Sequence, residues 1–248
     1  MPSLGSHLAS ARLLADRLAH RSVDADRGSF YLGSTAPDIR VITRLTRSEY
    51  HFFALDEVES QDAVARLFET HPALRGAVTL DVPTRAFMAG YLTHLVMDQD
   101  YIEGVYRRHF GSAMWGEDPR GNVLDRVLQF EMERREREHP EAIDEIRTVL
   151  ADASATADVA FIERETLERW LEVVRDVAAQ PPTWDRFPRM MSNHLQRAGY
   201  GEDEIAAICN DIPAILAETL DHVSEASIDE FLELTMDRSL ARVREYLQ

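Results

Sequence analysis

Apolar residues recur at steps of three and four positions along most of this chain, and this pattern limits its fold more than any other feature. Residues 7–20 put five apolar side chains on one helix face, namely Leu8, Ala11, Leu14, Ala15 and Leu18. The same period returns in the segments 119–138, 141–150, 157–179, 184–198, 202–220 and 228–247. No alternating run of strand length with hairpin turns beside it interrupts the pattern. The sequence therefore predicts an all-α fold, a bundle of many helices.

One segment differs from the others because it is apolar on nearly every side. Residues 86–97 read AFMAGYLTHLVM, with three exceptions: Gly90, Thr93 and His94. Asp81 and Pro83 just before it are typical of a helix start. A helix that is apolar all round belongs in the interior of a protein. We expect this helix to be central and buried, and we expect the apolar, glycine- and proline-containing segment 28–53 to be an irregular connection with short helical pieces.

The chain is interpreted as a single all-α domain over residues 1–248, because its N-terminal part offers few helices to enclose the apolar one. The segment SAMWGEDPR near 112–120 divides it into a histidine-rich half, 1–111, and a charged C-terminal helical subdomain, 112–248. Ser227 and Glu230 have the spacing of a capping box for the last helix. The oligomeric state and the role of the C-terminal part stay open at this point.

Charge and cysteine content exclude several classes of function. Lysine and arginine total 27 against 44 aspartates and glutamates, which gives a formal net charge of −17. Such a surface repels phosphate backbones, so nucleic-acid binding is not favoured. Cys209 is the only cysteine, which excludes internal disulfides and sites built from several thiolates. No apolar stretch reaches the roughly 18 residues of a membrane span, and the first residues do not resemble a secretory signal, so a cytoplasmic protein is expected.

The residues that can carry chemistry are histidines and carboxylates. His94 and Asp98 lie one turn apart on one face of the apolar helix, where they can share a metal ion. The spacing alone is not specific, but Asp98 follows twelve nearly continuous apolar residues. A buried carboxylate costs several kcal/mol unless a proton, hydrogen bonds or a cation compensates its charge. Two interpretations stay open, a metal ion or a hydrogen-bonded pair that an arginine from elsewhere neutralises. Gly90 would admit either a chain segment or an ion.

Three further candidates lie earlier in the chain. Asp38 follows Pro37 within an apolar stretch, and His51 precedes two phenylalanines. His7 stands at the start of the first predicted helix. Taken singly, an aspartate such as Asp38 is more often a helix cap, and a histidine such as His51 is more often a hydrogen-bonded core residue. For His7 a cap role is as plausible as a ligand role.

Four segments in this order resemble a known family over roughly residues 1–110. They are His7 at the first helix, FYLGSTAPD (30–38), His51-Phe52, and GYLTHLVMD (90–98). This combination resembles the bacterial zinc-dependent phospholipase C family, which is related in fold to the S1/P1 nucleases. The resemblance implies a multi-helix bundle of the phospholipase C/P1 nuclease type. It also implies a set of metal ligands: His7, Asp38, His51, His94 and Asp98.

The resemblance further implies a zinc-dependent phosphoester hydrolase that acts on a small-molecule or lipid-like phosphoester through metal-activated water. Asp38 takes a catalytic role in it as both ligand and base. Family members with three metals add an H-x-x-x-E pair, which this sequence lacks, so one or two zinc ions or another divalent metal are expected. Ile39 stands where choline-specific members carry an aromatic residue, so choline specificity is not expected.

The alternative belongs to a different class of protein. It is a non-catalytic helical protein in which a structural metal or a buried polar cluster holds the helices together, with a C-terminal half that binds a partner. Two other metal enzymes fit less well. An HD-type phosphohydrolase needs an adjacent His-Asp pair, which is absent, and a ferritin-like di-iron site needs two Glu-x-x-His motifs, of which only Glu136 to His139 occurs.

Overall fold

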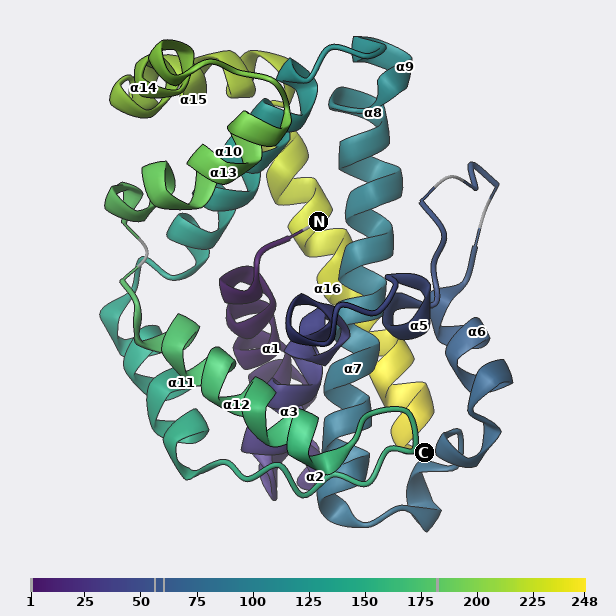
Figure 1. The fold of residues 1–248 in the computed structure, drawn as a ribbon. Coiled ribbons are helices and arrows are strands. Elements are labelled where there is room, and N and C mark those ends of the chain that lie inside the picture. The colour runs from purple at the N-terminus through teal and green to yellow at the C-terminus, as the bar shows by residue number, and fades with distance from the viewer. Residues whose placement is uncertain (1, 56, 60, 182) are drawn as a thin grey trace.

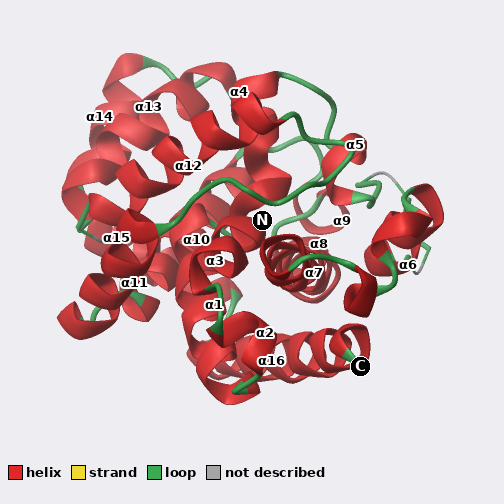
Figure 2. Cartoon of the chain, turned by 90° about the horizontal axis from the view of Figure 1, so that it is seen from below, coloured by secondary structure: helices red, strands yellow, loops and turns green. Residues whose placement is uncertain are grey.

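The protein consists of helices and connecting loops. The computed structural model describes residues 2–55, 57–59, 61–181 and 183–248, apart from the side chains of residues 190, 193 and 194. No strand occurs among these residues, and the all-α prediction is confirmed (Figure 2). None of the helices in the described ranges is both long enough and apolar enough to cross a membrane.

The helices follow one another with short connections (Figure 1). The first group is α1 (Leu4–Leu18), α2 (Arg21–Asp24), α3 (Arg27–Thr35), the 3₁₀ turn η1 (Ala36–Ile39), α4 (Arg40–Thr43) and α5 (Ser48–His51). The second group is α6 (Ala63–Thr70), the turns η2 (Pro72–Leu74) and η3 (Ala77–Thr79), α7 (Val82–Tyr101), the π-helical turn η4 (Ile102–Tyr106), α8 (Arg107–His109), α9 (Ser112–Trp115) and α10 (Arg120–Glu136). The third group is α11 (Pro140–Asp152), α12 (Arg164–Ala179), η5 (Trp184–Arg186), α13 (Phe187–Arg197), α14 (Glu202–Asn210), α15 (Ile212–His222) and α16 (Glu225–Leu247).

Helix α7 is the central element, and Figure 2 shows it end-on with other helices around it. Its start agrees with the prediction, because the Asp81 side chain accepts a hydrogen bond from the backbone N–H of Thr84 at 2.9 Å, and Pro83 lies in the first turn. Every residue in the range 86–101 is buried. The prediction of a central buried helix is confirmed.

Two glycines let α3 and α7 touch through their main chains. A Cβ atom on Gly90 would overlap the carbonyl oxygen of Phe30, and a Cβ atom on Gly33 would overlap the carbonyl oxygen of Phe87. Any larger residue at either position would push the helices apart. Of the two possibilities that the sequence left open for Gly90, the observed one is a chain segment, α3.

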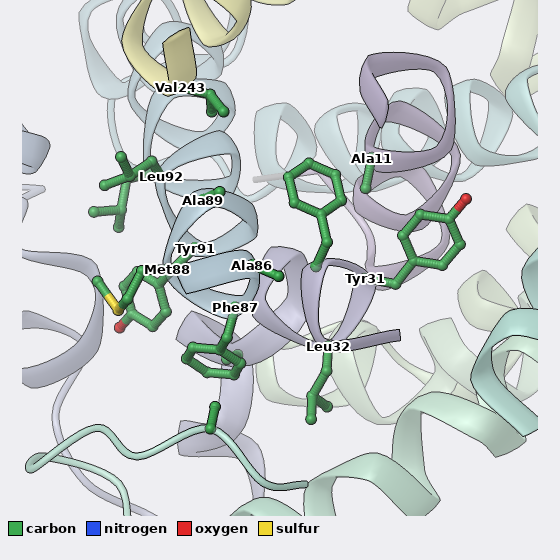
Figure 3. Close-up of a cluster of buried hydrophobic side chains, with 14 of the residues drawn as sticks. Ala11, Tyr31, Leu32, Ala86, Phe87, Met88, Ala89, Tyr91, Leu92 and Val243 are labelled. Atoms are coloured by element: carbon green, nitrogen blue, oxygen red, sulfur yellow. The ribbon is translucent and has the colours of Figure 1, made fainter. Parts of the chain in front are cut away.

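Two hydrophobic clusters fill the interior. The first surrounds α7 with side chains of α1, α3, α12 and the end of α16, and Figure 3 shows part of it, including Ala11, Tyr31, Leu32, Phe87 and Val243. The second joins α10 to α13, α14, α15 and the start of α16. Both clusters contain residues from either side of residue 111. The division of the chain at that residue stays a prediction.

Several local predictions differ from the structure. The segment after residue 26 is the regular helix α3, capped by Asp26, and the short helical pieces come only after it. The segment 202–220 is two helices, because Asp211 caps a new start at α15. Residues 157–163 precede α12 and are not helical. The predicted Ser227–Glu230 capping box is wrong, since Ser224 caps α16 by accepting from the N–H of Ser227.

Candidate metal centre

The five predicted ligands come from four separate elements. His7 lies in the first turns of α1, Asp38 in η1, and His51 at the end of α5. His94 and Asp98 lie one turn apart on α7. The structure brings all five side chains together beside the C-terminal half of α7, although 91 positions separate His7 from Asp98 in the sequence.

The atoms that could bind a metal face one another across short distances. The Nε2 atom of His51 lies 3.2 Å from Oδ2 of Asp98 and 3.5 Å from Oδ1 of Asp38. The Nε2 atom of His94 lies 3.3 Å from Nε2 of His51 and 3.5 Å from Oδ2 of Asp98. Two triads, His7–His94–Asp98 and Asp38–His51–His94, each have ligand atoms within 4.8 Å of one another. The triads share His94, so the arrangement offers two adjacent positions for an ion.

Contacts around the cluster orient two of the imidazole rings. The Nδ1 atom of His94 lies 2.8 Å from the carbonyl oxygen of Ser34 on α3. A carbonyl only accepts hydrogen bonds, so Nδ1 carries the proton and Nε2 is turned toward the cluster. The ring of His7 stacks on that of His94, with centroids 3.8 Å apart and 14° between the planes. A histidine that binds a metal through one ring nitrogen usually has a hydrogen-bond partner on the other, as His94 has in the Ser34 carbonyl oxygen.

His51 is positioned by the way in which α5 ends. Phe52 has a φ of 53°, a left-handed conformation that is uncommon for residues other than glycine, and it ends the helix directly after His51. The hydroxyl of Tyr91 on α7 donates to the carbonyl oxygen of Tyr50, just before His51. Backbone strain at such a place persists only where the surroundings enforce it. His51 is therefore held against α7 by the residue before it, Tyr50, and by the turn at the residue after it, Phe52.

Burial and neighbouring charges set the protonation of the cluster. Burial, assisted by the charge of His94, lowers the pKa of His7 to about 4, so His7 is neutral at pH 7. Burial raises the pKa of Asp98, but His94, Arg47 and the other histidines outweigh it and hold that pKa well below its usual value. His51 and His94 lower the pKa of Asp38 in the same way, against burial. Both carboxylates are therefore ionised, which is the form that binds a metal ion.

His94 has the opposite shift. Burial lowers its pKa, but the charges of Asp98 and Asp38 and the hydrogen bond to Ser34 outweigh this effect, so the pKa of His94 is raised. A metal ion at Nε2 therefore competes with a proton at that atom.

Unpaired atoms in the cluster test whether a metal ion fits. The Nε2 atom of His7 and the Oδ1 atom of Asp98 are buried, lie 3.4 Å apart, and make no hydrogen bond to any described residue. Leaving such an atom without a partner costs about 1–3 kcal/mol. Imidazole nitrogens and carboxylate oxygens are the ligands that zinc takes in proteins that lack suitable cysteines. The residues present therefore fit a zinc-type divalent ion.

Arg47 is a member of the cluster that the sequence analysis did not name. Its Nη2 atom donates to Oδ2 of Asp98 at 2.9 Å, so Asp98 does have an arginine partner, as one of the two interpretations allowed. A signal was present in the sequence. Residues 40–47 contain three arginines and no acidic residue, in a chain whose net charge is −17.

Two cavities border the cluster. Asp38, whose side chain is 14% exposed, lines a cavity of about 430 Å³. Arg47 lines a larger cavity of about 660 Å³. Arg40 and Arg126 contribute to the walls of both cavities. Small molecules can therefore approach the cluster from the side of Asp38 and from the side of Arg47.

Comparisons with known proteins do not identify a family. No family model matches this chain, and no significant match was found among curated proteins or solved structures. The resemblance noted in the sequence stays a prediction, and the functional argument is based on the geometry of the centre.

Proposed function

We propose that this protein is a metal-dependent phosphoester hydrolase whose ligands are His7, Asp38, His51, His94 and Asp98. The observation that carries the proposal is the convergence of these five side chains from four elements onto one buried point. Further support comes from the unpaired atoms within the cluster and from the arginines in the adjoining cavities. Two triads sharing one histidine fit one or two ions, and zinc is the metal that this ligand set suits best.

The residues of the chain have separate tasks in this proposal. A divalent ion held by these five residues would lower the pKa of bound water to about 7 and would screen the charge of a phosphoryl oxygen. The carbonyl oxygen of Ser34 keeps the proton of His94 on Nδ1 and the Nε2 atom free for binding. Asp38 is ionised and reaches a cavity, so its carboxylate can accept the proton of the attacking water. Arg40 in the cavity wall binds phosphoryl oxygens.

The test combines metal analysis with hydrolysis of bis(p-nitrophenyl) phosphate. We expect the zinc-loaded protein to hydrolyse this diester and the chelator-treated protein to lose the activity. Asp98→Asn should lower kcat/KM by about 100-fold or more and lower the zinc content, because it removes a charged ligand. Asp100→Asn is the matched control, since Asp100 is buried on the same helix but pairs with Arg238 outside the cluster.

Two outcomes would overturn the enzyme proposal. One is a zinc content below about 0.2 ions per chain after reloading, since structural and catalytic zinc sites retain their metal at neutral pH. The other is equal turnover by the wild type and Asp98→Asn.

A second candidate function has one observation in its favour. The ion pair between Arg47 and Asp98 already compensates the buried carboxylate, as expected of a polar cluster that only holds helices together. In that case the protein is a non-catalytic helical protein, and its C-terminal part is available to bind a partner. Zinc that raises the melting temperature without giving any turnover would favour this structural role over the enzyme.

A further inference from the structure

The larger cavity beside the metal centre has four arginines in its wall. Its volume is about 660 Å³, within the range of roughly 300–1,000 Å³ that is typical of small-molecule sites. The arginines come from four places in the chain, α4, the residue before α5, α8 and α10, and they are Arg40, Arg47, Arg107 and Arg126. The π-helical turn η4 directly precedes Arg107, and such turns are frequent at functional sites.

Three of these arginines form no ion pair with any carboxylate that the structure describes. Arg40 has no hydrogen-bond or ion-pair partner within the described ranges, and its Nε atom is buried. Arg107 donates to the backbone carbonyls of Leu55 and Glu57 and lies 5.6 Å from the centroid of the Phe53 ring. Arg126 donates to the neutral side-chain oxygen of Gln129 at 2.9 Å.

The described wall contains one carboxylate, and its oxygens are already engaged. Asp125 accepts a hydrogen bond from the hydroxyl of Tyr101 at 2.8 Å and another from the side-chain amide of Gln129 at 2.7 Å. By contrast, Arg27 on the surface has carboxylate oxygens of Asp16, Asp24 and Glu145 within 3.2 Å. In a chain with 44 acidic residues, positive charge that the described carboxylates leave unmatched in one cavity indicates a site for an anion.

The number of arginines limits the charge of that anion. The guanidinium group binds two phosphate oxygens at once, which favours phosphate over other anions. A phosphodiester carries a single negative charge, which one arginine beside a metal ion already matches. Three arginines without a described carboxylate partner, set against the single charge of Asp125, leave about two positive charges, which match a ligand with two or more negative charges. The remaining wall includes apolar side chains that fit an organic group: Leu55, Val58, Ile102 and Ala113.

We infer that this cavity binds an organic phosphate with two or more negative charges, either a terminal phosphate monoester or a diphosphate, in preference to a singly charged diester. The inference rests on the proposed function, because it names the substrate class of the same site. Arg47 connects the cavity with the metal centre, since it lines the cavity and also donates to Asp98. A phosphate group that binds Arg47 in this cavity therefore lies next to the metal centre.

Calorimetric titration of the chelator-treated protein with inorganic pyrophosphate tests this inference without any metal or turnover. We expect pyrophosphate to bind at least tenfold more tightly than dimethyl phosphate, and the affinity to fall as salt rises. Arg40→Gln should weaken pyrophosphate binding about tenfold, and Arg126→Gln should weaken it too. Arg169→Gln on α12 is the matched control, because it removes one exposed arginine that is not part of either cavity wall and should leave binding unchanged.

A parallel measurement distinguishes a free phosphate compound from a lipid headgroup. Phosphatidylcholine vesicles with and without phosphatidic acid are sedimented with the wild type and with Arg40→Gln. If the protein binds phosphatidic acid vesicles and this binding requires Arg40, the ligand is a lipid headgroup. If it binds pyrophosphate but not these vesicles, the ligand is a soluble phosphate compound. Both results support a multiply charged phosphate.

The inference is overturned if dimethyl phosphate binds as tightly as pyrophosphate, or if Arg40→Gln and Arg169→Gln bind pyrophosphate equally well. Circular dichroism confirms that each variant is folded before it is compared. Zinc is absent from these titrations, so a failure to bind pyrophosphate would not affect the test of metal-dependent hydrolysis. A protein that bound pyrophosphate but retained no zinc would support the anion site and contradict the proposed metal enzyme.

Discussion

Two groups of buried charged side chains differ in whether their atoms are fully paired. At the end of α10, Arg137 is 2% exposed and donates to Oε1 of Glu133 at 2.7 Å. Its Nη2 atom donates to carbonyl oxygens at the end of α12, including those of Ala178 and Gln180. A cation at a helix C-terminus is also favoured by the helix dipole. Each charge of this pair has a partner from the chain itself.

The metal centre is different because several of its buried polar atoms make no hydrogen bond to described residues. Five side chains that can bind a cation meet there, while atoms such as Nε2 of His7 and Oδ1 of Asp98 have no hydrogen bond to described residues. The pair on α10 is explained by the stability that it gives to the fold. The centre is able to hold a metal ion that the chain does not supply. Stability measurements with and without metal separate the two kinds of group.

The largest effect is expected at the paired group. Arg137→Leu removes the cation and leaves Glu133 buried without a partner, so the free energy of unfolding should fall by about 3–5 kcal/mol. Urea denaturation with and without zinc measures this loss, which should be the same in both conditions. Arg147→Ala, at an exposed ion pair 3.7 Å long, is the control and should change stability by no more than about 0.5 kcal/mol. A loss that zinc reverses would contradict the comparison.

The metal centre should give a smaller effect that depends on zinc. At a zinc concentration of about 100 times Kd, the wild type should gain about 3 kcal/mol in the free energy of unfolding, because only the folded chain presents the ligands together. His94→Ala should abolish this gain, since both triads contain His94. His139→Ala, an exposed histidine, should keep it. An equal gain in all three proteins would mean that zinc binds elsewhere.

A third charged group, which is partly buried, should give the smallest effect, and this effect depends on pH. Glu136 has one oxygen 3.4 Å from the hydroxyl of Ser10 and another without a hydrogen bond to described residues, and burial raises its pKa to about 8. Between the unfolded pKa near 4.5 and pH 8 the folded chain keeps this proton while the unfolded chain releases it. Stability from this group is therefore complete below pH 4.5 and is lost as pH rises toward 8.

Glu136→Gln removes this loss because an amide does not titrate. Relative to the variant, the wild type should become less stable by about 1–2 kcal/mol between pH 5 and pH 6.5. Urea denaturation of both proteins at several pH values, in chelator, gives this difference while the titration of the histidines cancels. A difference that stays constant over this range would contradict the raised pKa.

The helices, and the five side chains that converge beside α7, were anticipated better than the contacts around them. The position of α7 could be predicted because its signals are local. The apolar run lies within the helix itself, and Asp81 caps the N–H of a residue in its first turn. The cap of α16 was misassigned because Ser224 and Ser227 both suit a cap, and the packing of the helix start decides between them. The partnership of Arg47 with Asp98 joins residues 51 positions apart, and no local pattern encodes it.

The glycine contact between α3 and α7 has a consequence for the tolerance of the whole centre to change. Ser34, which orients His94, lies on α3, and Asp38 follows that helix closely, while two ligands lie on α7. Main-chain atoms, and not side-chain volumes, fix the separation of these helices at Gly33 and Gly90. Residues elsewhere in the core can therefore change size without moving the ligands apart, whereas adding one methyl group at either glycine would spoil the ligand geometry without altering any ligand.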